Sequence, residues 1–151
     1  MQSQNHEHGL GYSPVLIKAR KLCKSFTNGG ARIDILRDLD FDLSAGETSA
    51  IVGASGIGKS TLLHVLGALD RPDSGQLFFK GENVFSYDDT ALARFRNRTV
   101  GFVFQFHHLL PEFNAVENTM MPALIGGASK RHAIQTAEDL LVRVGRKDRL
   151  L

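Results

Sequence analysis

The residues best suited to chemistry form one glycine-rich loop. It reads Gly53-Ala54-Ser55-Gly56-Ile57-Gly58-Lys59-Ser60 and fits the pattern G-x-x-x-x-G-K-[ST] at every fixed position. Glycines permit backbone conformations that other residues resist, so successive N–H groups can turn inward as an anion nest. Those donors, together with the positive end of a following helix, suit a polyphosphate. The loop is therefore predicted to hold the phosphates of a nucleotide, with Lys59 reaching the β- and γ-phosphates and the Ser60 hydroxyl ligating Mg²⁺.

A phosphate loop of this kind needs a strand before it and a helix after it. Residues 48–52 are predicted to form the strand, and residues 59–69 the helix. Leucine and valine cover most of the circumference of that helix, which predicts burial between layers. The alternative, a glycine-rich turn that binds nothing, does not account for this context.

The remaining elements predict an α/β fold. An antiparallel pair is predicted upstream, because apolar residues alternate with polar ones along the second strand. Its strands are residues 15–22 and, in two halves, residues 33–36 and 39–43. Further strands are predicted at 76–80 and 100–104, and helices at 88–98, 115–121 and 129–144. Asp88 or Asp89 is expected to cap the first of these helices, and Gly145 to end the last.

Composition places the chain among ordinary globular proteins and predicts one soluble, cytoplasmic domain. Of its 151 residues 42% are hydrophobic and 23% charged, which excludes disordered, collagen-like and disulfide-stapled classes. The net charge of +2 gives no reason to expect a nucleic-acid partner. No apolar run approaches the roughly 18 residues of a membrane span. Residues 1–14 are polar and predict a disordered tail, not a signal peptide, and the single Cys23 fits a reducing compartment.

Beyond the loop, the sequence resembles the nucleotide-binding subunit of ATP-binding cassette (ABC) transporters. The similarity is carried by residues 39–47 leading into the loop, by Ser60-Thr61-Leu62-Leu63, by residues 69–75 and by Gly101-Phe102-Val103-Phe104-Gln105. Within that superfamily, residues 94–98, 102–113 and 114–118 are similar to the lipoprotein-releasing branch. The resemblance covers nearly everything from residue 15 to residue 151.

That resemblance implies a P-loop NTPase core of the ABC type, with an N-terminal antiparallel β-subdomain and the start of a helical subdomain. The core is expected over residues 15–105 and the helical subdomain from about 106 to 151. The expected cofactors are ATP and Mg²⁺. The residues expected to bind the nucleotide are Phe26, Gly53, Ala54, Ser55, Gly56, Ile57, Gly58, Lys59, Ser60 and Thr61.

Two residues outside the loop take their expected roles from the resemblance. Phe26 lies where such subunits place an aromatic ring that stacks on adenine; the alternative is a core aromatic of the first strand. Gln105 matches a glutamine that touches Mg²⁺ or the attacking water; the alternative is a solvated loop residue. Lys59 and Gln105 are thus the expected catalytic residues, and Ser60 and Gln105 the expected metal ligands.

Partners and location also follow from the resemblance. Two such subunits sandwich two ATP molecules and drive integral-membrane permease subunits from the cytoplasmic face of the inner membrane. The predicted function is therefore the ATP-binding subunit that powers release of lipoproteins from that membrane. The alternatives are the ATPase of a related efflux transporter, a non-catalytic nucleotide-binding remnant, and a non-transporter ABC protein.

Several parts that the family uses for hydrolysis have no match in this sequence. They are a signature loop of L-S-G-G-Q type, an apolar strand ending in Asp-Glu, and a later histidine; the Gly126-Gly127 pair lacks the signature pattern. The chain is therefore expected to be a truncated N-terminal fragment that binds nucleotide weakly and is inactive alone. The adjacent His107 and His108 lack further metal ligands, so they are predicted to contact a partner or to pack within a loop.

Overall fold

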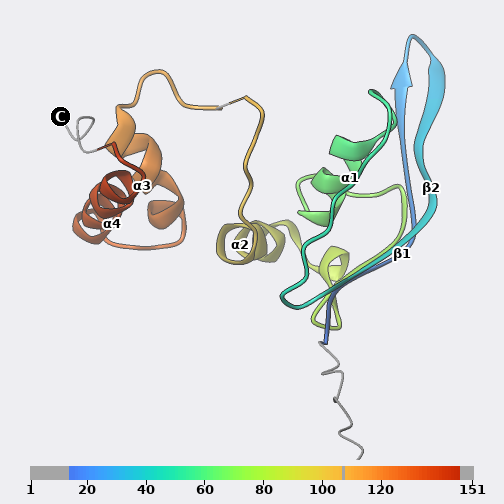
Figure 1. The fold of residues 1–151 in the computed structure, drawn as a ribbon, viewed down its shortest axis with the longest axis horizontal. Helices are drawn as coiled ribbons and strands as arrows, with labels where there is room; N and C mark the ends of the chain where they lie inside the picture. The colour runs from blue at the N-terminus through green and yellow to red at the C-terminus, as the bar shows by residue number, and fades with distance from the viewer. Residues whose placement is uncertain (1–13, 107, 147–151) are drawn as a thin grey trace, which may run out of the picture. The chain divides into compact units, whose positions relative to one another are not determined.

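A computed structural model describes residues 14–106 and 108–146. The chain divides into two compact units, Met1–Tyr87 and Asp88–Leu151, which are described separately (Figure 1). The expected tail, apart from Pro14, and His107 lie outside the described residues. The expected subdomain boundary near residue 105 is a different division of the chain and stays a prediction.

The first unit is built on a four-stranded antiparallel sheet. Strands β1 (Val15–Asn28) and β2 (Ala31–Ser44) form a long hairpin. Strand β3 (Ser74–Phe79) pairs with the other edge of β1 and with the short β4 (Glu82–Asn83), which gives the order β2-β1-β3-β4. The predicted antiparallel pair and the predicted third strand are confirmed.

Irregularities in the β1–β2 pairing make both strands longer than predicted. The register shifts between Ala19 and Lys24, and the backbones of Lys21 and Asp38 have φ values of 48° and 45°. Such β-bulges absorb extra residues without ending a strand. Strand β2 therefore continues through the polar stretch that separates its two predicted halves.

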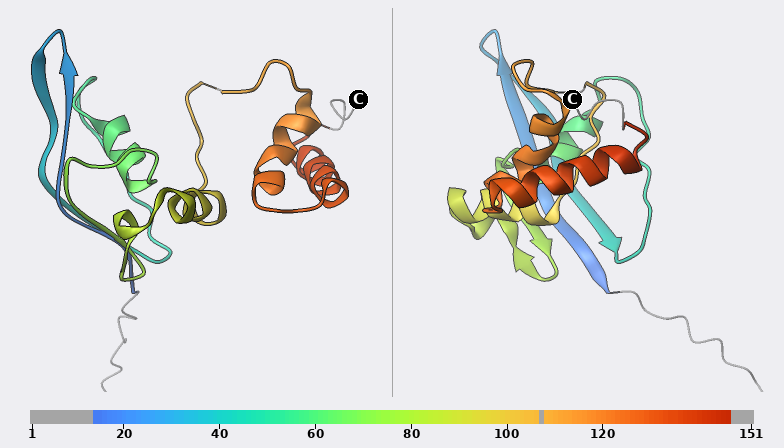
Figure 2. Two further views of the ribbon diagram at one scale, coloured as in Figure 1. Left: turned by 180° about the vertical axis from the view of Figure 1, so that it is seen from behind. Right: turned by 90° about the vertical axis from the view of Figure 1, so that its left-hand side faces the viewer.

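Helix α1 (Lys59–Leu66) packs against β1 and β2 (Figures 1 and 2). The buried core of the unit comes from this helix, the sheet and the 3₁₀ turn η1 (Val84–Ser86); its largest members are Leu22, Leu36, Leu62, Val65, Leu77 and Val84. The helix begins where predicted but ends three residues early, because Gly67 caps it and Ala68 has a φ of 55°. Leu63 is 51% exposed, so only one face of the helix is buried in the described structure, contrary to the prediction.

Two predicted strands, residues 48–52 and 100–104, are not strands in the described structure. A strand exists through hydrogen bonds to a neighbour, and neither segment pairs with another described strand. Their apolar side chains are correspondingly open, with Val52 87% exposed and Val103 102% exposed. The prediction of strands there was wrong for the described residues, although the local sequence favours extended backbone.

The described part of the second unit, residues 88–106 and 108–146, forms three helices, α2 (Asp89–Thr99), α3 (Ala115–Ile125) and α4 (Lys130–Arg143). Helices α3 and α4 pack on one another, and the buried residues of the pair are Val116, Ala133 and Ala137. Asp88 caps α2 as expected, and Gly145, with a φ of 75°, follows the end of α4 as expected.

Helix α3 continues past its predicted end at residue 121. Pro122 lacks the N–H that would continue the helical hydrogen bonds. Its carbonyl, however, accepts hydrogen bonds from the backbone N–H of Gly126 (3.0 Å) and from Nδ2 of Asn97 on α2 (2.9 Å). These bonds stabilise one further turn after the proline.

Candidate nucleotide-binding site

The glycine-rich loop enters helix α1 through a residue that must be glycine. Gly58, the N-cap residue of α1, has a φ of 102°, a conformation that favours glycine. A Cβ atom at this position would lie 2.5 Å from Cγ2 of Ile35 and 3.7 Å from Cδ2 of Leu36, both on β2. The loop is therefore anchored against the sheet by a close approach of its backbone.

The start of α1 presents backbone donors. The helical hydrogen bonds begin with the N–H of Leu62, which donates to the carbonyl of Gly58 over 2.9 Å. The N–H groups of Lys59, Ser60 and Thr61 precede that bond, and no side chain caps this end of the helix. With no acidic residue in the first turn, the positive end of the helix dipole is left uncompensated by the protein. This arrangement suits an anion.

The side chain of Lys59 folds back onto the beginning of the glycine-rich loop. Its Nζ donates to the carbonyl oxygens of Gly53 (2.8 Å) and Ala54 (2.6 Å). A cation is thus held at the beginning of the glycine-rich loop by two backbone carbonyls. A lysine ammonium group and the N–H groups of a helix start are both of the kind that binds phosphate.

The remaining loop residues fit a site open to solvent. Ser60 and the loop residues Ala54, Ser55, Gly56 and Ile57 are exposed, and Thr61 is half-buried. The Ser60 hydroxyl, next to Lys59, offers the hard oxygen that Mg²⁺ prefers. Mg²⁺ usually takes one or two protein ligands and completes its shell with substrate phosphates and water, so one hydroxyl here fits the ion.

Phe26 lies on β1 with its ring partly open. Its side chain is 45% exposed, so it is not a core aromatic. Its partner across the hairpin is Ile33, two residues from the Ile35 that contacts the Gly58 backbone. The structure thus brings the Phe26 end of the hairpin and the phosphate loop to the same region of the first unit.

Gln105 belongs to the second unit and is exposed. The residues on either side of Gln105 form an aromatic cluster. The ring centroids of Phe102 and Phe104 lie 5.3 Å apart in a stacked arrangement, and the His108 ring meets Phe104 edge-on with the centroids 4.9 Å apart. His108 therefore packs within its loop, which is one of its two predicted roles. No group of three or more potential metal-binding side chains occurs among residues 14–106 and 108–146.

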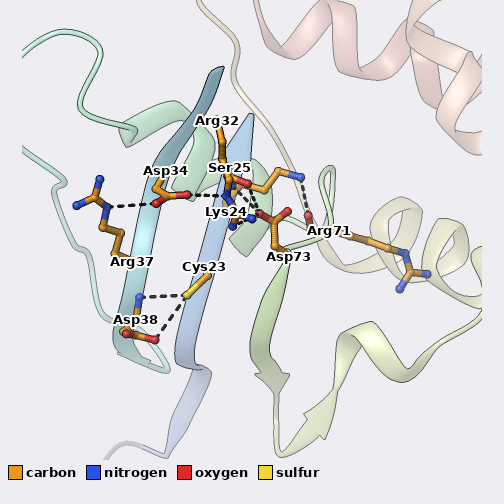
Figure 3. A network of polar contacts seen from close by, with 9 residues as sticks. All are labelled: Cys23, Lys24, Ser25, Arg32, Asp34, Arg37, Asp38, Arg71 and Asp73. Atoms are coloured by element: carbon orange, nitrogen blue, oxygen red, sulfur yellow. Dashed lines mark hydrogen bonds and ion pairs between the residues drawn. The ribbon is translucent and has the colours of Figure 1, made fainter. Parts of the chain in front are cut away.

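A polar network at the turn after α1 was missed by sequence reasoning (Figure 3). The Asp73 carboxylate accepts hydrogen bonds from the backbone N–H (2.8 Å) and the hydroxyl (2.5 Å) of Ser25. These bonds hold the pKa of Asp73 below its usual range, and the bond from the Ser25 hydroxyl has the larger effect. In the sequence, two aspartates flank Arg71-Pro72. This pattern indicates a turn, but it does not show which residues of β1 the turn contacts.

The loop, the helix start and the sheet define a P-loop nucleotide-binding protein, and comparison with known proteins gives its family. The sequence profile described as ABC transporter matches residues 36–150. The chain therefore belongs to the ABC transporter family.

Three relatives share one name, "Lipoprotein-releasing system ATP-binding protein LolD". The protein of Idiomarina loihiensis is 55% identical over 136 residues, which cover 90% of this chain and 60% of the relative. Those of Syntrophus aciditrophicus and Geobacter metallireducens are each 53% identical over 135 residues, covering 89% of this chain and 60% of the relative. The chain thus spans about 60% of the length of these curated relatives.

Solved structures confirm the expected fold class. The ATP-binding cassette MJ0796, in a dimeric post-hydrolysis state bound to ADP and Pi, aligns with a TM-score of 0.76 and 30% identity. A second dimeric structure of MJ0796, described as a bacterial ABC transporter cassette, gives the same TM-score at 31% identity. Each alignment covers 83% of this chain and 56% of the other. Among the residues described here, no helix combines the length and the apolar character needed to cross a membrane.

Proposed function

We propose that this protein is the ATP-binding subunit of an ABC transporter that powers release of lipoproteins from the inner membrane. The observation that carries the proposal is the uncapped start of α1, where Lys59 donates to two loop carbonyls and is followed by Ser60. The identity of 53–55% to three lipoprotein-releasing ATP-binding proteins supports the transport process.

The phosphates of ATP would lie against the N–H groups of the loop and of residues 59–61. Lys59 would exchange its two carbonyl acceptors for the β- and γ-phosphate oxygens, since phosphate is the stronger acceptor for an ammonium group. Phe26 would stack on adenine. Bound Mg²⁺ would supply charge neutralisation at the phosphates, and Ser60 and Gln105 are the residues proposed to hold it.

The proposed assembly follows the expectations from sequence. Two subunits would sandwich ATP, and integral-membrane permease subunits would hold them at the cytoplasmic face of the inner membrane. The dimeric cassettes of MJ0796 support the pairing of subunits. In this assembly, residues 15–105 would form the nucleotide-binding core and residues from about 106 would begin the helical subdomain.

Removal of the Lys59 ammonium tests the ATP-binding role. Lys59→Ala in the full-length protein is expected to weaken Mg-ATP binding about 100-fold, because two charge-assisted bonds to phosphate are lost. Isothermal titration calorimetry measures the affinity. Lys18→Ala removes the same charge from an exposed site on β1 and is expected to leave the affinity unchanged. Equal ATP affinity of the Lys59→Ala variant and the unmodified protein would contradict the assignment.

A further inference from the structure

Lys24 is a lysine with an unusually fixed position. Its side chain is 12% exposed, although it lies on the same strand as the open Phe26. Its Nζ donates to Oδ1 of Asp70 (2.8 Å) and to the carbonyl of Arg71 (2.7 Å), both in the turn that follows α1. The ammonium group is therefore held in place by the turn and does not move freely in solvent.

The fixed ammonium group lies against the Phe26 ring. Nζ is 5.3 Å from the ring centroid, within the range of a cation–π contact. Residues two apart on a strand point to the same face, so this contact follows from the position of both residues on β1. Contact with a cation restricts the rotation of the ring, and it draws electron density toward one face of it.

The same turn joins the strand that carries the ring to the segment after helix α1. Figure 3 shows Lys24 and Ser25 of β1 directed at the turn residues. Asp73 accepts two hydrogen bonds from Ser25, and its own N–H donates to the carbonyl of Cys23 over 2.8 Å. The turn follows helix α1, whose first residues carry the phosphate-binding groups. Three successive β1 residues, immediately before Phe26, are thus hydrogen-bonded to the turn that follows α1.

We propose that Lys24 is a positioning residue for nucleotide binding, which holds the Phe26 ring at the orientation and electron density that favour stacking on a purine base. The inference rests on the proposed function, because it takes Phe26 as the platform for adenine. Lys24 itself would contact neither the base nor the phosphates. It would therefore affect ligands that carry a base and leave those without one unchanged.

The test compares two ligands that share a triphosphate. Affinities for Mg-ATP and for inorganic tripolyphosphate with Mg²⁺ are measured by calorimetry in the full-length protein. Lys24→Met is expected to weaken ATP binding about fivefold, because that factor corresponds to the free energy of one partly exposed cation–π contact. The affinity for tripolyphosphate should stay the same. Lys24→Arg retains a cation over the ring and is expected to restore the ATP affinity. Lys18→Met, the same change at an exposed site of β1, is expected to alter neither ligand.

A double variant separates this inference from the proposed function. In the Phe26→Ala background, Lys24→Met is expected to have no further effect on ATP affinity. If Lys24→Met weakens both ligands equally, or neither, Lys24 does not act through the ring and the inference is wrong. If Phe26→Ala lowers ATP affinity while Lys24→Met does not, the inference fails and the proposed function stands. If Phe26→Ala leaves ATP affinity unchanged, the adenine platform is itself misassigned.

Discussion

The start of helix α1 differs from the starts of the three helices in the second unit. Each of α2, α3 and α4 has a side chain that accepts a hydrogen bond from a first-turn backbone N–H, whereas α1 has a glycine in that place. The capping residues are Asp88, Asn114 and Ser129, and they accept from the N–H groups of Ala91, Glu117 and His132. Helices α2 and α3 also carry an acidic residue in the first turn, and α1 does not.

This difference separates helix starts whose backbone donors are satisfied by a side chain from one whose donors are available to a ligand. A cap side chain satisfies donors that the helix itself cannot satisfy, and it typically contributes about 1 kcal/mol of stability. Helix α1 forgoes this contribution and keeps its donors available for an external anion. Packing of Leu62 and Val65 into the core, together with the close approach of Gly58 to β2, stabilises the helix instead.

Among the substitutions considered, Gly58→Ala is expected to have the largest effect on the start of α1. The new Cβ would require an unfavourable φ and would overlap the Ile35 side chain, so we expect the free energy of unfolding to fall by about 2–4 kcal/mol. ATP binding should be lost at the same time. Chemical denaturation and calorimetry measure the two effects.

Gly56→Ala provides the matched control for this change. Gly56 also has a positive φ, of 80°, but a Cβ there would meet no atom within 4 Å. Its cost is expected to be about 1 kcal/mol, from the backbone conformation alone. Equal destabilisation by the two variants would show that the contact with Ile35 does not anchor the loop.

A carboxylate in the first turn of α1 should make its start resemble that of α3. We expect Thr61→Glu to stabilise the helix by about 0.5 kcal/mol through its dipole and to weaken Mg-ATP binding about tenfold through repulsion of the phosphates. Thr61→Gln, nearly the same size as the glutamate without its charge, measures the effect of replacing the side chain alone and should weaken ATP binding less than Thr61→Glu. Undiminished ATP affinity of Thr61→Glu at low ionic strength would argue that the phosphates bind elsewhere.

Asn114→Ala should have a smaller effect, and on stability alone. Asn114 and Glu117 form a reciprocal capping box at the start of α3, with both hydrogen bonds at 2.9 Å. Loss of the cap is expected to cost about 1 kcal/mol of stability in denaturation experiments and to leave the ATP affinity unchanged. A change in nucleotide affinity would mean that this helix start is not purely structural.

Local signals in the sequence predicted the parts of the fold that depend on neighbours close in the chain. Alternating residues predicted the antiparallel hairpin, and Asp88 and Gly145 marked the start of α2 and the end of α4. The starting residue of α1 followed from the loop motif. The helix starts and ends are set by hydrogen bonds or turns within a few residues, and the hairpin joins two strands that are consecutive in the chain.

Features set by distant residues could not be predicted in the same way. Residues 48–52 have the composition of a strand, but a strand also requires a neighbour, which the described structure does not supply. The extension of α3 past Pro122 depends on Asn97, 25 residues away. The attachment of Lys24 and Ser25 to Asp70 and Asp73 likewise joins segments 46 to 48 residues apart.

The N–H groups at the start of α1 are proposed to bind the phosphates of ATP. Amide hydrogen exchange, measured residue by residue with and without Mg-ATP, tests it most directly. Exchange should slow at Lys59, Ser60 and Thr61 when Mg-ATP is added. The capped N–H groups of Ala91 and His132, which already donate to side chains, should exchange at the same rate in both conditions. Unchanged exchange at residues 59–61 under saturating Mg-ATP would contradict the account.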